Sequence, residues 1–528
     1  MKTNSPAGTK TLTTKVLIIG GGVTGTGVMR DLALRNISSI LIDQHDLNSG
    51  ASGSNHGLLH SGGRYAAKDR DTAIECRVEG EILKRVASNC IDPCGGMFVA
   101  VDGDDLDFAS QFPDHCQAAG ISCTPLSPSQ AMEREPSLTK KIVAAYEVAD
   151  ATIDPFRLTL ESVNHAMELT DSFYMPHTRV EAFEIGDGEI RAALCRDGRS
   201  GEQIRIEAEE VVNAAGAWAM RVARLAGCNN VNLLYSKGTL IISNSRMSSG
   251  VINRLRPPGD GDILVPGGTV SLLGTTSATI ENPDRITPTV DEVDRILAEG
   301  TDMVPSLADA RFIRAFAGVR PLLMASGHGG DGREASRGFA LFDHKEQNLR
   351  NFATVTGGKL TTFRLMAERV GDLIAKRLGS SAPCKTAVVP LPSGPAICWT
   401  EPGFSARDWY ARQDPTDRIL CECEMVSESS IDSIINEAPG SEADMSVKAI
   451  SLRSRVGKGS CQGAFCSIRV TSYLYDKGIY SSEAGLAHLR DFVKERFKGV
   501  RPVLWGAHVA QMELAEALHC DLMGLDLK

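Results

Sequence analysis

The sequence predicts an α/β fold, and three features of its 528 residues support this prediction. An apolar strand at Lys15–Ile19, a glycine-rich turn and a helix at Thr26–Arg35 lead into a second apolar strand at Ser39–Asp43. Residues 352–377 repeat the order of strand, glycine pair and helix much later in the chain. Residues 95–345 mix strands, turns and short helices. Together these features indicate a Rossmann-like domain with a mixed-sheet domain inserted into it.

The composition is that of an ordinary globular chain. Hydrophobic residues make up 42% and charged residues 23% of it, which is enough apolar material for several domains. A net charge of −10 provides no general attraction to nucleic acid, so no nucleic-acid partner is expected. The N-terminal residues are polar, and no run of ~18 apolar residues occurs. We therefore expect neither a signal peptide nor a transmembrane helix.

The elements between the two glycine-rich segments are predicted from their apolar patterns. Residues 66–92 and Asp291–Leu297 have helical spacing, and Arg256–Pro266 alternates as a strand does. A stretch rich in proline and glycine, Pro390–Pro402, is predicted to be a linker. The chain is accordingly divided into a flexible tail at 1–14, a two-domain body at 15–385, a linker at 386–417, a cysteine-containing module at 418–470 and a C-terminal helical segment at 471–528.

A helix is predicted at residues 486–500 because its apolar residues form one stripe. Its basic residues lie mostly off that stripe. We favour a helix that docks on the protein's own core, and a face for a membrane or a partner is the alternative.

The glycine-rich turn matches the pattern of a dinucleotide-binding site. Gly20 permits the tight turn, Gly22 lets the backbone approach a diphosphate, and Gly25 allows close packing of helix on strand. The diphosphate is expected at the helix N-terminus, where free N–H groups favour anions. Asp43 follows the second strand and is placed to accept hydrogen bonds from a ribose.

Two segments favour FAD over NAD as the dinucleotide. Residues 50–65 form a long loop of small residues soon after Asp43, which could run along the diphosphate and the flavin. Residues 213–218 are a strand end that turns into small residues, so the backbone can approach a bound cofactor.

At this point the motifs carry a family likeness. The chain resembles the FAD-dependent glycerol-3-phosphate dehydrogenases, within the D-amino-acid-oxidase-like flavoproteins, over about residues 14–378. With the C-terminal cysteines included, the likeness extends to the whole chain and narrows to the large catalytic subunits of the bacterial anaerobic enzymes. It rests on the glycine motif and on HSGGRY (60–65), DPFRL (154–158), VVNAAGAW (211–218), LLGTTS (272–277), AGVRPL (317–322) and GGKLTTFR (357–364).

The resemblance implies a D-amino-acid-oxidase-like fold, a Rossmann-like FAD-binding domain with an inserted mixed-sheet substrate domain. It implies substrate contacts from Arg64, Arg320 and Lys359. Guanidinium and ammonium groups bind phosphate dianions well, so these residue types agree with a phosphate substrate. It places FAD against Gly20, Gly22, Gly25, Asp43, Ser52, Gly216, Gly357, Gly358, Leu360 and Thr361.

The implied reaction is oxidation of sn-glycerol 3-phosphate to dihydroxyacetone phosphate, by hydride transfer from C2 to FAD. Arg320 and Lys359 are expected to polarise the hydroxyl. The proton acceptor is expected to be a histidine or a lysine, and His60 and His56 are the candidate histidines. Aerobic members of the family carry a histidine where this chain has Leu240, so the role of that histidine cannot be carried over.

Four cysteines near the C-terminus predict a metal site. Cys421 and Cys423 form a C-x-C pair, and Cys461 and Cys466 form a C-x4-C pair 37 residues further on. Four thiolates can hold a two-iron cluster or a tetrahedral Zn²⁺. The spacing resembles the bacterioferritin-associated-ferredoxin-like [2Fe-2S] module, so we favour [2Fe-2S] over structural zinc and over reduced cysteines without a ligand. Basic residues in Arg453–Gly459 are expected to offset the charge of the cluster.

The resemblance also implies partners. Electrons are expected to leave through the cluster to a membrane-associated iron–sulfur subunit, together with a second flavin subunit, and finally to reach quinone. The chain is then expected to lie peripherally on the cytoplasmic face of the inner membrane.

Two alternatives remain at this stage. One is an FAD-dependent dehydrogenase of an amino or opine acid with the same cluster module, which needs an acidic partner for the amine that the sequence does not make obvious. The other is an iron-cluster binding or delivery protein with a vestigial flavin fold, against which the intact glycine motif argues.

Overall fold

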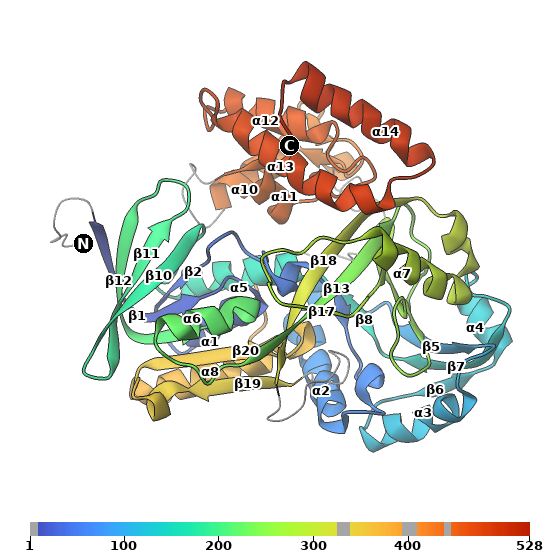
Figure 1. Cartoon of the computed structure of the whole chain (residues 1–528), viewed down its shortest axis with the longest axis horizontal. Coiled ribbons are helices and arrows are strands. Elements are labelled where there is room, and N and C mark those ends of the chain that lie inside the picture. Colours follow the sequence, from blue (N-terminus) through green and yellow to red (C-terminus); the bar gives the residue numbers. More distant parts are fainter. Residues whose placement is uncertain (1–8, 325–337, 393–408, 438–444, 528) are drawn as a thin grey trace.

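The structure of the chain, a computed structural model, is built on two large β-sheets with a helical unit above them (Figure 1). It describes residues 9–324, 338–392, 409–437 and 445–527. Within these residues no helix is both long and apolar enough to cross a membrane.

The first sheet is parallel at its centre, as the βαβ pattern predicts. β1 pairs in parallel with β2 on one side and with β12 on the other, and β9 and β20 extend this order. The antiparallel strands β10, β11 and β19 complete the sheet. Its strands are β1 Thr9–Ile19, β2 Ser39–Ile42, β9 Phe173–Met175, β10 Thr178–Gly186, β11 Glu189–Asp197, β12 Gln203–Asn213, β19 Phe339–Asp343 and β20 Phe352–Gly357.

The prediction of a flexible tail over residues 1–14 is wrong for its second half. β1 already begins at Thr9, because Thr9–Thr14 pair in register with Gln203–Ala208 of β12. This half of the strand is rich in threonine, a good strand former, but only Leu12 is buried as an apolar residue. The apolar run used to locate the strand therefore marks only its deeply buried end.

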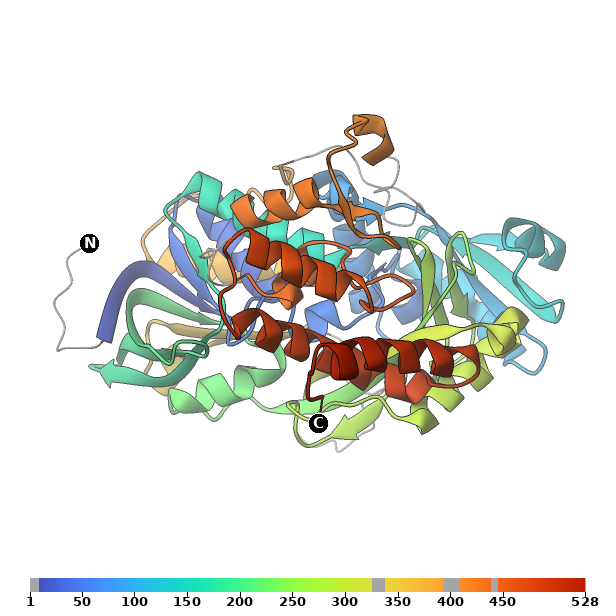
Figure 2. The same cartoon turned by 90° about the horizontal axis from the view of Figure 1, so that it is seen from above.

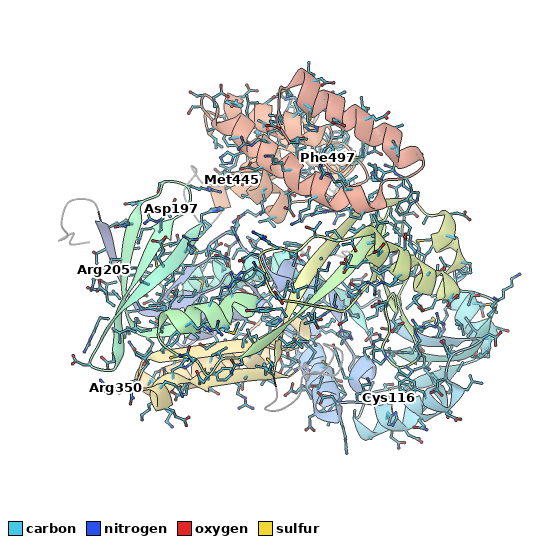
Figure 3. All side chains as sticks on the ribbon, in the orientation of Figure 1. Cys116, Asp197, Arg205, Arg350, Met445 and Phe497 are labelled. Atoms are coloured by element: carbon cyan, nitrogen blue, oxygen red, sulfur yellow. The ribbon has the colours of Figure 1, made fainter. Side chains whose placement is uncertain are left out.

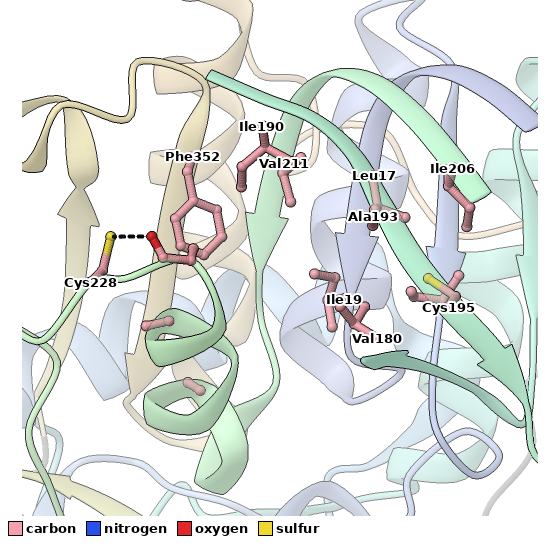
Figure 4. Close-up of a cluster of buried hydrophobic side chains, with 14 of the residues drawn as sticks. Leu17, Ile19, Val180, Ile190, Ala193, Cys195, Ile206, Val211, Cys228 and Phe352 are labelled. Atoms are coloured by element: carbon pink, nitrogen blue, oxygen red, sulfur yellow. Dashed lines mark hydrogen bonds between the residues drawn. The ribbon is translucent and has the colours of Figure 1, made fainter. Parts of the chain in front are cut away.

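Alternate residues of β1 enter two different cores. Leu17 and Ile19 pack with the β10–β11 hairpin and with α6 (Ala219–Leu225), and Figure 4 shows this cluster. Val16 and Ile18 face the opposite side of the sheet. The helices on that side are α1 Val23–Leu34, α5 Pro155–Leu169 and α8 Phe363–Arg377. A central strand covered on both faces explains the continuous apolar sequence that predicted it.

The second sheet is mixed and forms the inserted domain. β18 pairs along its length with β13, and β5 and β14 are the parallel pair within an otherwise antiparallel order. Its strands are β5 Gly96–Val101, β6 Thr124–Leu126, β7 Ile142–Val148, β13 Leu233–Ser243, β14 Val251–Arg254, β15 Ile263–Gly267, β16 Val270–Gly274, β17 Ala278–Ile280 and β18 Phe312–Leu323. The helices of this region are α2 Arg70–Val86, α3 Leu106–Ala118, α4 Pro128–Arg134 and α7 Val290–Met303.

Three short strands, β3 Leu58–Leu59, β4 Ile91–Asp92 and β8 Ala151–Ile153, form a third, small sheet. The strand predicted at Arg256–Pro266 begins only at Ile263. The carboxylate of Asp262 accepts hydrogen bonds from the Gly259 N–H and the Arg256 guanidinium, and this closes a turn where the pattern indicated a strand.

The C-terminal residues from 419 onward form one unit that lies over the body (Figures 1 and 2). The predicted boundary at residue 470 is wrong, because α12 runs through it and one core joins both sides. Met445 and Phe497 lie within this unit (Figure 3). Its elements are β21 Ile419–Cys421, β22 Val426–Ser427, α10 Glu428–Glu437, α11 Val447–Arg453, α12 Cys466–Asp476, α13 Ala484–Val500 and α14 Ala507–Glu516.

The linker predicted at 386–417 begins later than residue 386. Leu391 is buried, and its N–H donates to the Val86 carbonyl, so the body extends to that point. Most of the proline- and glycine-rich stretch that predicted the linker lies outside the described residues.

Helix α13 docks on the protein's own core, as favoured from its sequence. Leu489, Phe492 and Val493 are buried within the C-terminal unit. Gly499 lies against β18 so closely that a Cβ there would come 2.5 Å from the Ala315 carbonyl oxygen. The apolar stripe is therefore used inside the molecule.

A buried ion pair joins the C-terminal unit to the first sheet. Arg453 of α11 donates to both carboxylate oxygens of Asp46, at 2.8 and 3.2 Å, and each side chain is 6% exposed. The Tyr174 hydroxyl also donates to Asp46. Arg453 and these hydrogen bonds lower the pKa of Asp46 although burial alone would raise it.

We predict that Asp46→Ala destabilises the protein strongly, because it leaves the Arg453 guanidinium buried without its carboxylate. The expected loss in the free energy of unfolding is about 3–5 kcal/mol, measured by urea denaturation. Asp491→Ala, which breaks an exposed pair with Arg490, is the control and should change stability by less than ~0.5 kcal/mol. Equal urea midpoints for Asp46→Ala and Asp491→Ala would contradict the prediction. The double variant Asp46→Leu, Arg453→Met removes both buried charges and should recover stability, so a double variant as unstable as Asp46→Ala would also contradict it.

Candidate active site

A cavity of about 570 Å³ lies where the two sheets meet. The first sheet contributes Val23 and Thr24, at the start of α1, and Gly357–Leu360 after β20. The second sheet contributes Leu240 of β13 and Arg320 of β18. The loop between β2 and α2 forms much of the remaining wall. Segments far apart in the sequence therefore share one chamber.

The turn between β1 and α1 has the shape that its glycines predict. Gly20 has a φ of +118°, and a Cβ there would lie 2.5 Å from the Ala214 carbonyl oxygen. A Cβ on Gly25 would lie 1.9 Å from the Gly20 carbonyl oxygen. Only glycine fits either position, so α1 can start directly at the end of β1 with its first turn open to the cavity.

Asp43 holds this turn in place. One carboxylate oxygen accepts the Gly21 N–H at 2.7 Å, and the other accepts the His45 N–H at 2.8 Å. Burial raises the pKa of Asp43 to about 6, although the two N–H donors counteract it. The Ser52 hydroxyl accepts the Val23 N–H at 3.0 Å, which places it at the N-terminus of α1.

The residues predicted to bind FAD all gather on this side of the cavity. Thr361 is buried directly behind the wall, and its hydroxyl accepts the His60 N–H. Gly22 passes so close to Ser52 that a Cβ would come 2.9 Å from its hydroxyl oxygen. The chain thus offers an open helix N-terminus and a backbone cradle that side chains would fill, which fits a bound dinucleotide. The predicted residues that line the cavity itself are Ser52, Gly216, Gly357, Gly358 and Leu360.

The charged residues of the cavity wall are mostly cations. Arg64, Lys68, Arg320 and Lys359 line it, and Asp69 is the carboxylate among the lining residues. The structure therefore brings the three predicted substrate cations together. Asp69 and the fourth cation, Lys68, follow the HSGGRY segment in the chain, and the sequence pattern did not predict them as site residues.

Arg320 is anchored at the end of β16. Its Nη2 donates to the Thr275 hydroxyl at 2.5 Å, and its Nη1 donates to the Thr276 carbonyl at 3.3 Å. The guanidinium lies over Gly238, where a Cβ would come 2.4 Å from Nη2. Because these contacts fix the guanidinium plane, Arg320 can present a preorganised charge to a substrate.

Arg64 and Lys359 are held differently. Arg64 makes a buried ion pair with Asp262 at 2.5 Å and donates to the Arg254 carbonyl. Burial would raise the pKa of Asp262, but Arg64 and the neighbouring arginine lower it. The Lys359 ammonium lies 5.3 Å from the centre of the Tyr65 ring, within reach of a cation–π interaction. Asp262 was not foreseen, since nothing in its sequence context marks it as a partner of Arg64.

Two histidines, His56 and His60, also line the cavity. Burial lowers the pKa of His60 to about 3, and the charges of Lys359 and Arg64 add to this effect. Burial likewise lowers the pKa of His56 to about 3. Both rings are therefore neutral at physiological pH.

The four C-terminal cysteines converge at one point of the helical unit. The Sγ atoms of Cys421 and Cys423 are 3.9 Å apart, and those of Cys423 and Cys461 are 3.7 Å apart. The thiol of Cys466 interacts with those of Cys421 and Cys461. Cys423 is exposed, whereas Cys421 and Cys466 are buried. No group of three or more His, Cys, Asp or Glu in the described part of the chain already has the geometry of a metal site.

The surroundings of these cysteines suit a negatively charged sulfur cluster. Hydrogen bonds from Cys423 and Cys466 lower the pKa of both Cys421 and Cys461, and backbone hydrogen bonds act in the same direction. Four converging thiols with N–H donors fit a two-iron cluster or a zinc ion. Arg496 of α13 is a half-buried cation whose charge acts on Cys461 and Cys466.

The basic residues predicted to neutralise this site do so only in part. Arg453 pairs with Asp46, whereas Arg455 pairs with Glu424 and is also close enough for its charge to act on Cys421. Lys458 lies 4.6 Å from the centre of the Phe156 ring of α5. The sequence order pointed to these residues because they precede Cys461, whereas Arg496 comes from a helix that only the tertiary fold brings close.

A parallel sheet with an open glycine turn, an acid after the second strand and an inserted mixed sheet define an FAD-dependent oxidoreductase. The chain belongs to this family, since the family model described as FAD dependent oxidoreductase matches residues 15–373. The D-amino-acid-oxidase-like fold expected from the motifs is thereby confirmed.

Relatives are similar over nearly the full length. One subunit of the anaerobic glycerol-3-phosphate dehydrogenase of Escherichia coli (strain K12) is 38% identical over 97% of this chain and 97% of its own. Subunit A1 of the anaerobic glycerol-3-phosphate dehydrogenase of Haloferax volcanii is 36% identical over 97% of this chain and 91% of its own. The glycerol-3-phosphate dehydrogenase from Bacillus halodurans, solved in complex with FAD, has the same fold, with a TM-score of 0.65 at 22% identity over 94% of this chain and 96% of that one. The resemblance inferred from the motifs is thus confirmed.

We predict that Gly25→Ala abolishes FAD binding, because the added methyl group would collide with the Gly20 carbonyl and push α1 away from the turn. The measurement is the flavin released per protein chain on denaturation. Gly186→Ala, at the end of β10, is the control, since its Cβ would meet nothing closer than 3.8 Å. Full flavin content in Gly25→Ala would show that the contact at the turn does not govern binding.

Proposed function

We propose that the protein oxidises sn-glycerol 3-phosphate to dihydroxyacetone phosphate with FAD as its cofactor. The observation that carries this proposal is the charge of the cavity, where Arg64, Lys68, Arg320 and Lys359 stand against one carboxylate among the described lining residues. Asp262 pairs with Arg64 from behind the wall, and the described lining keeps an excess of cations over carboxylates. That excess suits a phosphate dianion. The printed names of the relatives, which are glycerol-3-phosphate dehydrogenases, support the same substrate.

When bound, FAD supplies the acceptor for the hydride that leaves the carbon bearing the secondary alcohol. The chain's own residues bind and orient the substrate. Arg64, whose charge Asp262 offsets, offers guanidinium N–H donors to the phosphate, while Arg320 and Lys359 polarise the hydroxyl with charges held by Thr275 and by the Tyr65 ring. Burial, aided by the charges of Lys359 and Arg64, lowers the pKa of His60 and keeps its ring neutral.

We further propose that the four cysteines hold a [2Fe-2S] cluster. A cluster there would allow the two electrons of each turnover to leave one at a time. The exposure of Cys423 supports an exit at the protein surface. The relatives are named as single subunits of a larger enzyme, which supports transfer to associated subunits, namely a membrane-associated iron–sulfur subunit, together with a second flavin subunit. Quinone is then the final acceptor, and the protein lies peripherally on the cytoplasmic face of the inner membrane.

A dehydrogenase of an amino or opine acid is the second candidate. Asp69 favours it, because a carboxylate on the cavity wall can pair with a substrate ammonium group. This carboxylate also accepts the Thr72 N–H at the start of α2, and it is outnumbered by the cations around it. The phosphate substrate is therefore preferred.

We predict that glycerol 3-phosphate, added without oxygen, bleaches the flavin band near roughly 450 nm. Arg320→Met should keep its flavin but bleach at least ~10²-fold less efficiently, because a preorganised charge is lost. Arg295→Met, an exposed position on α7, is the control and should behave as the wild type. If an amino or opine acid bleached the flavin and glycerol 3-phosphate did not, the proposed substrate would be wrong.

We predict that protein purified without oxygen contains two irons and two sulfides per chain, and that dithionite reduction gives the electron paramagnetic resonance signal of a two-iron cluster. Cys421→Ser combined with Cys461→Ser should lose the iron and the signal but keep the flavin. Cys520→Ser, outside the four-cysteine group, should keep both. Stoichiometric zinc, or neither metal in protein with intact thiols, would exclude the cluster.

A further inference from the structure

The loop that carries Cys461 is packed tightly against α13. A Cβ on Gly457 would lie 2.5 Å from the Phe492 ring, and one on Gly463 would lie 2.7 Å from it. Both glycines have a positive φ, +71° and +93°, so they are needed for the backbone conformation as well as for space. Phe492 is buried, and the loop therefore has a fixed position relative to this helix.

Arg496, one turn after Phe492 on the same helix, is fixed between the helix and this loop. Its guanidinium carbon lies 5.0 Å from the centre of the Phe492 ring, and its Nη2 donates to the Ser451 hydroxyl at 2.9 Å. The Ser451 hydroxyl in turn donates to the carbonyl of Val456, the residue before Gly457. These contacts hold the guanidinium at the aromatic ring and limit the positions that its charge can take.

Arg496 and Cys461 also line one small cavity. Its volume is about 10 Å³, which leaves room for about one water molecule, and its other walls are mostly apolar. Because little water can enter this space, the charge of Arg496 is poorly screened at the cysteine site. Burial lowers the pKa of Arg496 to about 9, so the guanidinium keeps its charge at neutral pH.

The charge of Arg496 is not offset by an ion pair. Among the described residues it pairs with no carboxylate, and Glu495, the acid beside it in the chain, pairs with Arg314 at 3.6 Å. By contrast, Arg455 on the other side of the cysteines is paired with Glu424. A cation with a carboxylate partner adds little net charge to its surroundings, whereas Arg496 adds a full positive charge.

We propose that Arg496 raises the reduction potential of the four-cysteine site when this site holds a [2Fe-2S] cluster; this rests on the proposed cluster. On reduction the site takes up one electron, its donor is oxidised by that electron, and no bond to the chain forms or breaks. The site thereby becomes more negative by one unit of charge. A fixed cation without a carboxylate partner stabilises this more negative state, so Arg496 favours the passage of electrons from the flavin to the cysteines.

The test is a dithionite titration of the full-length protein, purified without oxygen, followed by the electron paramagnetic resonance signal of the reduced cluster. Arg496→Met should lower the equilibrium constant for cluster reduction ~10-fold, which for a one-electron couple is a fall of about 59 mV in the midpoint potential. Arg496→Gln, which keeps a side-chain N–H donor without the charge, should lower it similarly. Arg496→Lys keeps the charge and should stay close to the wild type. Arg490→Met, which removes an exposed arginine from the same helix, is the matched control and should leave the potential unchanged.

An unchanged potential in Arg496→Met and Arg496→Gln, with iron and sulfide at wild-type levels, would overturn the proposal. Loss of iron from both variants would also overturn it, because Arg496 would then be needed to hold the cluster and not to set its potential. If the potential of Arg496→Lys fell as far as that of Arg496→Met, packing and not charge would be responsible, and the proposal would again be wrong. Wild-type protein without iron and sulfide would instead refute the proposed cluster, so the two failures differ.

Discussion

The close contact between α1 and the end of β1 is the constraint on which the site depends. A side chain at Gly25 would overlap the Gly20 carbonyl, and one at Gly20 would overlap Ala214 of the neighbouring chain segment. Since no other residue fits, the helix starts at the edge of the parallel sheet and points its N-terminus into the cavity. Hydrogen bonds tie Asp43 and Ser52 to that turn and to the first residue of α1.

The inserted sheet supplies the opposite wall and its chemistry. The three cations predicted to contact a substrate are held in different ways. Arg64 pairs with the carboxylate of Asp262, Arg320 donates to neutral oxygens of Thr275 and Thr276, and Lys359 lies over the ring of Tyr65. Each contact limits the positions that the charged group can take, so the wall presents its cations in a fixed arrangement.

The C-terminal unit is integrated with the body through both polar and apolar contacts. The buried pair of Asp46 and Arg453 ties it to the loop that follows Asp43, and Gly499 seats α13 on β18. β18 also carries Arg320 towards the cavity. The cysteine site and the cavity thus rest on the same sheets, which suits a protein that would pass electrons from one to the other.

The sequence by itself determined the parallel βαβ unit, the glycine turn, the grouping of the cysteines and the family. Each of these depends on residues that are neighbours in the chain, on a backbone conformation that only glycine adopts without strain, or on several motifs in a matching order. The local pattern gave the wrong secondary structure at two places. Thr9–Thr14 form a strand because they pair with β12, and the first half of Arg256–Pro266 forms a turn because the carboxylate of Asp262 accepts the Gly259 N–H. Tertiary structure alone decided that Asp262 pairs with Arg64 and that Arg496 reaches the cysteines. These features join residues distant in sequence, and their energies depend on burial and on geometry that no local pattern records.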